Sequence, residues 1–152
     1  MPPRKRRVPV VLDTNVIIAF HLSTNQHSPN VKIYRLWRNE RRLQLIVSDE
    51  TASEYLEILS RLGVSDKRIK QLKERLERRQ TVTHVKLGGR PAVSRDPDDN
   101  LVLATALVGK AKFIITNDRD LLDMPASAKR KFKFAVVTPS EFLKAFEAEA
   151  TG

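Results

Sequence analysis

The sequence predicts an α/β fold, a three-layer α/β/α sandwich with a central, mainly parallel sheet of four to five strands. Short apolar segments alternate along the chain with longer segments of helical periodicity, which is typical of strand–helix–strand units. The first segment, VPVVL at residues 8–12, is the kind of β-branched run expected for a strand buried on both faces. With 152 residues and neither an internal repeat nor a linker, we expect one domain at residues 8–149 after a basic tail at residues 1–7.

The individual elements follow from apolar periodicity and from capping residues. Ser48 and Ser65 are expected helix N-caps, Gly63 ends a helix, and Pro139 suits a first helical position. The expected strands are residues 8–12, 43–47, 81–87, 112–116 and 134–137. The expected helices are residues 15–22, 31–42, 49–62, 66–79, 96–108 and 139–149. We expect residues 117–122 to form a turn with about one helical turn, and residues 129–133 to form a basic loop.

The charge balance favours a polyanionic partner. The chain has 28 lysines and arginines against 18 acidic residues, a net charge of +10, which favours nucleic acid before membrane. The absence of cysteine excludes disulfides, thiolate chemistry and cysteine-ligated zinc. No apolar run approaches the roughly 18 residues of a membrane span. The basic start leads into too short an apolar run for a secretion signal, so we expect a cytoplasmic protein.

Acidic residues recur where an α/β sheet places its ligands, outside the carboxyl ends of the strands. Asp13 ends the first strand, and Asp118 follows the strand at residues 112–116. Asp98 and Asp99 occupy the first turn of a helix that begins at the same edge of the sheet. Glu54 borders the apolar stripe of the helix after the second strand.

Each of these acids also has a structural interpretation. Asp13 or Thr14 would cap the first helix, and Asp118 would cap the turn after its strand. Asp96 and Asp99 have the spacing of a capping box, and Glu54 could be a solvated flank. An accidental meeting of four carboxylates at one edge is the less favoured alternative. Like charges at such short distances repel each other unless a cation binds between them.

The cation that such a group would hold is a hard one. Only oxygen ligands are available, which suits Mg²⁺ or Mn²⁺ rather than zinc. His21, His27 and His84 have no partner at ligand spacing, and we interpret all three as non-catalytic.

At this point the chain resembles the PIN domain family of metal-dependent ribonucleases. The segments VVLDTNVII, SDETASEYLEIL, DPDDNLVLATAL, FIITNDRDLL and VVTPSEFL match the family pattern in order, over residues 8–146. Within the family, the chain is most similar to the PIN proteins described as toxin components of toxin–antitoxin pairs. The resemblance implies a PIN-like fold, a ribonuclease activity, RNA as substrate, and an antitoxin protein and further copies of the chain (a homodimer or higher homo-oligomer) as candidate partners.

The family's functional residues transfer one by one. Its acids fall on Asp13, Glu54, Asp99 and Asp118, with Asp13 and Asp118 expected as direct metal ligands and the other two binding metal or orienting its waters. Aligning ATAL with the family's alanine-rich helix favours Asp99 over Asp98, which stays an alternative. The family has a polar residue two positions after its first acid, and Asn15 occupies that position here. The family also has a hydroxyl residue at the end of a strand, and Thr116 occupies that position. The expected supporting residues are Thr14, Asn15, Asp98, Thr116 and Asp120.

The basic residues are candidates for holding the RNA backbone. The densest basic runs are the tail and the helix at residues 66–79, although either could be only a solvated surface. Aromatic residues are not interleaved with these runs, so base stacking is not indicated. The expected RNA-binding residues are Arg4, Arg6, Lys70, Lys73, Arg78 and Arg119.

Other function classes fit less well. The five glycines form neither of the glycine-rich phosphate loops of Rossmann dehydrogenases and P-loop NTPases. A phosphoaspartyl hydrolase usually has a second acid two residues after the first, where this chain has Asn15. The remaining alternative is a non-catalytic RNA-binding or signalling domain that keeps an acidic metal pocket.

Overall fold

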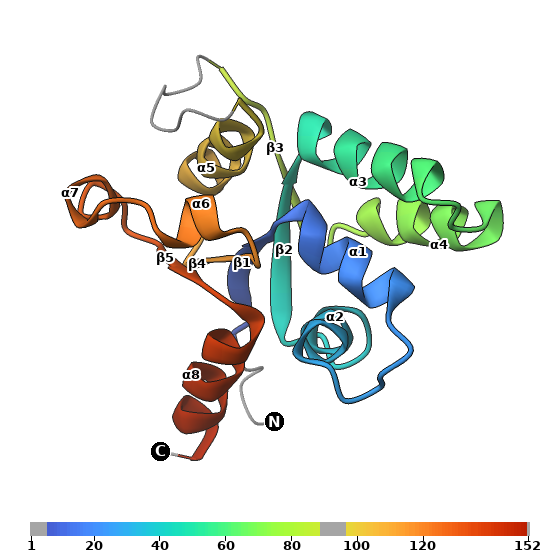
Figure 1. Ribbon diagram of the computed structural model, residues 1–152, viewed down its shortest axis with the longest axis horizontal. Helices are drawn as coiled ribbons and strands as arrows, with labels where there is room; N and C mark the ends of the chain where they lie inside the picture. The colour runs from blue at the N-terminus through green and yellow to red at the C-terminus, as the bar shows by residue number, and fades with distance from the viewer. Residues whose placement is uncertain (1–5, 89–96, 152) are drawn as a thin grey trace.

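The computed structural model describes residues 6–88 and 97–151, without the side chains of residues 97–100, 150 and 151. Its centre is a five-stranded sheet in the order β3-β2-β1-β4-β5, with every neighbouring pair parallel (Figure 1). The predicted α/β fold with a central parallel sheet is therefore confirmed. The strands are β1 (Val8–Leu12), β2 (Leu43–Ser48), β3 (Val82–Val85), β4 (Phe113–Ile115) and β5 (Ala135–Val137).

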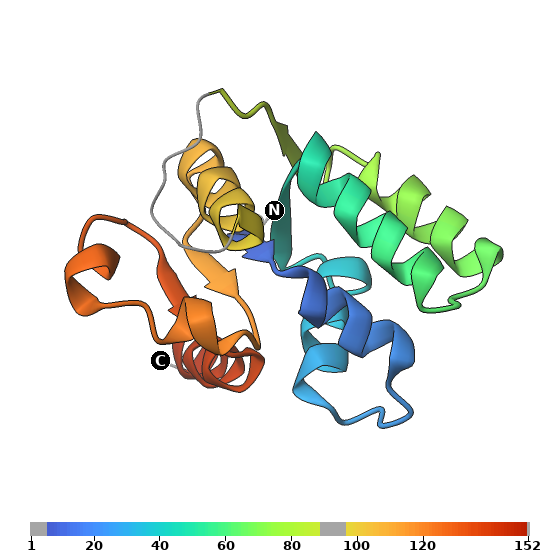
Figure 2. The ribbon, with the colours of Figure 1, turned by 45° about the horizontal axis from the view of Figure 1, so that its top comes forward.

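Helices cover both faces of this sheet, as Figure 2 shows from a second side. Residues of α1–α4 and α8 pack with one face, and residues of α5, α6 and α7 pack with the other. The helices are α1 (Thr14–Leu22), α2 (Pro29–Arg38), α3 (Asp49–Arg61), α4 (Asp66–Leu76), α5 (Pro97–Gly109), α6 (Arg119–Leu122), α7 (Ala126–Lys129) and α8 (Pro139–Thr151). None of the helices within the described ranges has both the length and the apolar content that crossing a membrane requires.

Strand β1 lies at the middle of the sheet and contributes to both halves of the core. Val10 and Leu12 belong to the cluster under α1–α4, whereas Val11 belongs to the cluster under α5. This division follows from the alternation of side chains along a strand. All three residues are at most 1% exposed, so the residue that follows them, Asp13, extends from a rigid support.

The helix starts are specified by short-range capping, as the sequence indicates. The Ser48 hydroxyl accepts from the Thr51 backbone N–H, and the Thr51 hydroxyl accepts from that of Ser48, which completes a capping box. Ser65 caps α4 in the predicted way. Gly63 has a φ of +81°, a left-handed conformation that favours glycine where the preceding helix ends.

Some element boundaries differ from those expected. Helix α2 begins at Pro29 because the Ser28 hydroxyl accepts from Val31 N–H and proline occupies the first turn. Helix α4 ends at Leu76, before the predicted residue 79. The short helix α7 was not predicted, because four residues without a side-chain cap leave no periodic pattern in the sequence.

Helix α5 is held against β2 by a buried polar contact and a close approach. The hydroxyls of Ser48 and Thr105 lie 3.0 Å apart, within hydrogen-bonding distance. One turn further along the helix, a Cβ built on Gly109 would lie 2.3 Å from Cγ2 of Ile46. Glycine therefore allows the end of α5 to lie directly on the sheet.

Candidate functional site: a carboxylate centre at the edge of the sheet

Three donors hold the carboxylate of Asp13. It follows β1, is 9% exposed and is the N-cap of α1. Its Oδ1 accepts from Thr14 N at 2.8 Å, while Oδ2 accepts from Thr116 Oγ1 at 2.7 Å and from Asn15 Nδ2 at 3.0 Å. The capping interpretation is therefore correct for Asp13, and capping uses only one of its two oxygens.

Thr116 connects Asp13 to Asp118. Its buried hydroxyl donates to Asp13 and accepts from the backbone N–H of Asp118 at 2.9 Å. Asp118 in turn caps α6, because its Oδ1 accepts from Asp120 N at 2.9 Å. The parallel pairing of β1 with β4 aligns Leu12 with Ile115, and this register brings Asp13 and Thr116 to the same edge of the sheet.

Glu54 reaches the same place from α3. The hydroxyl of Thr14 donates to Glu54 Oε2 at 3.0 Å. The neighbouring Tyr55 is buried and its hydroxyl donates to the carbonyl oxygen of Leu12, which joins α3 to the last residue of β1. Thr14 thus joins Glu54 to Asp13, since its hydroxyl donates to Glu54 and its backbone N–H donates to Asp13. The Thr116 hydroxyl joins Asp13 to the backbone N–H of Asp118. We call Asp13, Glu54 and Asp118 together the carboxylate centre.

Burial makes negative charge at this centre costly. Desolvation raises the pKa of Asp13, and the nearby charge of Asp118 raises it further, while the hydrogen bonds from Thr116, Thr14 and Asn15 oppose the shift. Burial likewise raises the pKa of Tyr55, with the charges of Asp13 and Glu54 adding to it. Within the described part of the chain, Asp13 forms no ion pair that would offset these effects.

Several residues of the network have no clear signal in the sequence. The Asn15 side-chain oxygen accepts from the backbone N–H of Asn117 at 3.1 Å, and Asn117 Nδ2 donates to Asn30 Oδ1 at 3.0 Å. Asn117 directly follows the strand-end threonine, and this position could have suggested it. Asn30 lies in α2, far away in the sequence, and only the packing of α1 against α2 brings it close. Tyr55 lies in a segment of helical periodicity, and this pattern does not reveal its hydroxyl contact.

The third acid is not placed by the structure. Asp98 and Asp99 belong to the first turn of α5, but their side chains lie outside the described residues. Among the residues that are described, no three histidine, aspartate or glutamate side chains lie close enough to hold one metal ion. The donor set nevertheless consists of oxygen atoms, and a buried carboxylate without an ion pair suits a hard divalent cation. The residues present therefore fit Mg²⁺ or Mn²⁺ chemically.

Those predicted RNA-binding residues that the structure describes lie on several different segments. Lys70 and Lys73 are exposed on α4, which packs on α3, and Arg78 is exposed just after α4. Arg119 is exposed at the start of α6, next to Asp118. Arg6 is exposed before β1, and Arg4 lies outside the described residues.

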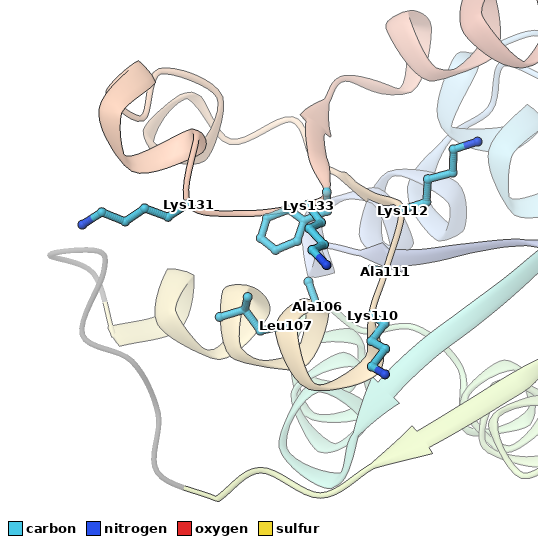
Figure 3. A pocket seen from close by; sticks show the side chains of 8 residues that line it. Ala106, Leu107, Lys110, Ala111, Lys112, Lys131 and Lys133 are labelled. Carbon is cyan, nitrogen blue, oxygen red and sulfur yellow. The ribbon is translucent and has the colours of Figure 1, made fainter.

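A cavity of about 550 Å³ lies away from the carboxylate centre, at the amino ends of β4 and β5 (Figure 3). Its lining includes Ala106 and Leu107 of α5 and Phe134 before β5. The side chains of Lys112 and Lys131 extend from its rim in opposite directions. The described residues that line the cavity include no acid.

Comparison with known proteins identifies the family. The family model for the PIN domain matches residues 9–120. PAE2754 from Pyrobaculum aerophilum resembles the chain with a TM-score of 0.56 at 18% sequence identity, over 93% of this chain and 90% of that one. VapBC2 from Rickettsia felis, in a crystal structure bound to a DNA fragment from their promoter, gives a TM-score of 0.54 at 13% identity, over 86% of this chain and 98% of that one.

These similarities support different statements. At such low identity the two structures establish the fold alone, and no curated protein sequence matches this chain. The family model spans well over half of the chain and includes Asp13, Glu54, Asp99 and Asp118. The resemblance seen in the sequence is thus confirmed, and the chain belongs to the PIN domain family.

Proposed function

We propose that the protein is a metal-dependent endoribonuclease that cleaves RNA phosphodiester bonds at the carboxylate centre. The observation that supports this most is the placement of Asp13. It is buried at the carboxyl edge of the sheet, held by three donors and linked to Asp118 through Thr116. PIN domains are generally ribonucleases, so family membership favours the same activity.

In this proposal Asp13 and Asp118 hold Mg²⁺ or Mn²⁺, and Glu54 and Asp99 hold the metal or orient its waters. A divalent ion bound there would lower the pKa of a water and stabilise charge on the scissile phosphate. Asp13 must be ionised to act as a ligand, and a cation would offset the desolvation that raises its pKa. The roles of Asp99 and of the alternative Asp98 remain proposals from the family pattern.

The supporting residues keep the acids in position. Thr116 and Asn15 donate to one oxygen of Asp13 and leave the carboxylate a single orientation. Thr14 holds Glu54. Asp120 contributes its backbone N–H to Asp118. Arg119, exposed beside Asp118, is suitably placed to attract a phosphate toward the acids.

The test is RNA cleavage by the purified chain with Mg²⁺, with Mn²⁺ and with EDTA, beside Asp13→Asn. We expect cleavage with either metal, none in EDTA, and a loss of at least about 100-fold in the variant. Asp49→Asn is the matched control, because Asp49 is an exposed acid in the first turn of α3. Cleavage that persists in EDTA or in Asp13→Asn would rule out this mechanism.

The same experiment separates the alternative function. A non-catalytic RNA-binding or signalling domain would bind RNA without cleaving it under any metal condition. Asp13→Asn would then change RNA affinity only.

We further propose that the protein acts as the toxin of a toxin–antitoxin pair in the cytoplasm. The support is the sequence resemblance to such PIN proteins, together with the likeness in fold to VapBC2. The test is expression of the chain alone and together with the product of a short upstream reading frame. We expect growth arrest with the chain alone, relief and co-purification with the partner, and no arrest with Asp13→Asn. Light scattering of the purified chain tests the expected homodimer or higher homo-oligomer.

A further inference from the structure

A second polar site lies between α1, α2 and α4, at the carboxyl end of α1. It is a cavity of about 70 Å³ lined by arginines from two helices, Arg38 of α2 and Arg68 and Arg75 of α4. The described residues that line it include no aspartate or glutamate. Three positive side chains therefore converge on one small space without an opposite charge in its wall.

Two of the arginines are held in place by contacts with neighbouring helices. Arg68 Nη1 donates to the carbonyl oxygen of His21 at 3.0 Å, and Arg75 Nη1 donates to that of Arg38 at 3.5 Å. Within residues 6–88 and 97–151, none of the three forms an ion pair. Partial burial and the charges of Arg78 and Arg38 lower the pKa of Arg75, which indicates that the cluster is electrostatically unfavourable without a counter-ion.

His21 adds a buried polar group with no partner. Its side chain lines the cavity and is 7% exposed, yet neither ring nitrogen has a hydrogen bond in the described structure. The Nε of Arg38 is also buried without a partner. Buried polar groups are nearly always paired with protein, water or a ligand, so two unpaired groups beside one cavity indicate that the cavity holds a polar occupant.

We propose that this cavity binds a phosphate group, either inorganic phosphate or the terminal phosphate of a nucleotide or RNA. Guanidinium groups match phosphate oxygens in geometry, and a doubly charged anion offsets a cluster of three arginines better than a singly charged one. A cavity needs about 10–15 Å³ of volume to hold one water molecule. The cavity of about 70 Å³ therefore has room for a group of about five heavy atoms but not for a nucleoside.

This site is independent of the proposed nuclease reaction. His21 and Asp13 lie at opposite ends of α1, about 12 Å apart along the helix at 1.5 Å per residue. Among the described residues, none that lines the cavity is a hydrogen-bond partner of Asp13. Either proposal can therefore fail without the other.

The test is calorimetric titration of the full chain with inorganic phosphate at constant ionic strength, with chloride as the reference anion. Proton NMR of the three histidine rings locates the binding. We expect saturable binding that shifts the His21 signals and leaves those of His27 and His84 unchanged. Arg68→Gln should weaken phosphate binding by at least about 10-fold, since it removes a charged hydrogen-bond donor.

Lys67→Gln is the matched control, because it removes one charge from an exposed neighbour on the same helix. Arg75→Gln is a second variant, in case Arg68→Gln disturbs the packing of α4 on α1. Thermal unfolding of each variant checks that the fold is kept.

Oligonucleotides with a 5′-phosphate or a 5′-hydroxyl then distinguish the source of the phosphate. Displacement of inorganic phosphate by the phosphorylated oligonucleotide alone supports a site for nucleic-acid ends. Binding of inorganic phosphate without such displacement supports a site for the free anion. The proposal is overturned if phosphate binds no better than chloride, if the His21 signals do not move, or if Arg68→Gln and Lys67→Gln behave alike.

Discussion

The two ends of α1 carry buried titratable side chains in opposite situations. Asp13 at the amino end is 9% exposed and has three hydrogen-bond donors. His21 at the carboxyl end is 7% exposed, and its ring has no hydrogen-bond partner among the described residues. Burial moves both toward the neutral form, since it raises the pKa of Asp13 and lowers that of His21 to about 4.

The difference between the two ends lies in what surrounds each charge. Around Asp13 the chain supplies neutral donors, which keep the carboxylate in one orientation and leave its charge uncompensated for a cation. Around His21 the chain supplies Arg68 and Arg38, which repel a proton and add to the effect of burial. We propose a cation for the first end and an anion for the second, so changes at each end should have different consequences.

The largest expected effect is on RNA cleavage at the carboxylate centre, which lies at the amino end of α1. Asp99→Asn should lower RNA cleavage by about 100-fold, because it removes a proposed metal ligand or water-orienting group. Removing one of several crowded carboxylates should keep or raise the melting temperature without metal. Cleavage assays and thermal unfolding measure both. A large loss of stability would instead show that Asp99 acts as a cap of α5, and cleavage at the normal rate by Asp99→Asn would assign the third acid to Asp98.

The second largest effect concerns the pH dependence of the unfolding free energy, to which His21 at the carboxyl end of α1 contributes. The folded-state pKa of His21, about 4, lies below its unfolded value of 6.5, so His21 contributes stability above pH 6.5 that is lost as the pH falls toward 4. This contribution to the unfolding free energy is about 3 kcal/mol. The residues facing His21 are Arg68, Arg38 and the Tyr34 ring, and none of them changes charge in this interval.

His21→Leu should therefore flatten the dependence of the unfolding free energy on pH between 6.5 and 4, measured by urea denaturation. His27→Leu, at an exposed loop position, is the matched control and should leave the wild-type slope. Equal slopes in wild type and His21→Leu would show that His21 is not protected from protonation in the folded state.

A smaller effect is expected from the hydroxyl that links the two acids. Thr116→Val removes the donor to Asp13 and the acceptor for Asp118 N–H, which should cost about 1–3 kcal/mol of unfolding free energy at pH 7. The hydroxyl lowers the pKa of Asp13, so its loss raises that pKa further, and the variant should recover part of its stability when acid protonates the carboxylate. Thr116→Ser keeps the hydroxyl and is the control. If Thr116→Val and Thr116→Ser are equally stable at pH 7, Thr116 stabilises the fold by packing rather than by its hydrogen bonds.

The smallest effect tests whether the exposed lysines of α4 attract RNA. Replacing Lys70, Lys73 and Arg78 together by Gln should reduce the slope of log affinity against log salt by about 2, because each neutralised phosphate contributes roughly 0.7 to 0.9. The fold should be kept, because Leu72 and Leu76 form the buried side of the helix.

The control for this change is the triple variant of Lys110, Lys131 and Lys133 at the opposite edge of the sheet. Deletion of residues 2–7 tests the basic tail separately. If the α4 variant and the tail deletion both leave the salt slope unchanged, the attraction comes from elsewhere, with Arg119 beside the acids as the first residue to replace.

The sequence by itself determined the features that depend on neighbours along the chain. Ser48 and Ser65 cap helices through N–H groups three residues away, and the run before Asp13 is apolar and β-branched, so both could be predicted. The order of strands and helices predicted the parallel sheet. A parallel sheet places the carboxyl ends of its strands at one edge, and this rule predicts from the sequence that Asp13 and Asp118 lie close together.

Only the tertiary structure decided which distant side chains complete each site. The contacts of Asn117 with Asn30 and of Tyr55 with Leu12 join positions 43 or more residues apart. The arginine cavity is of the same kind, because Arg38 and Arg68 belong to separate helices whose basic residues resemble ordinary solvated faces in the sequence. Periodicity shows which face of a helix is buried, but the neighbour that this face meets depends on packing across the whole chain.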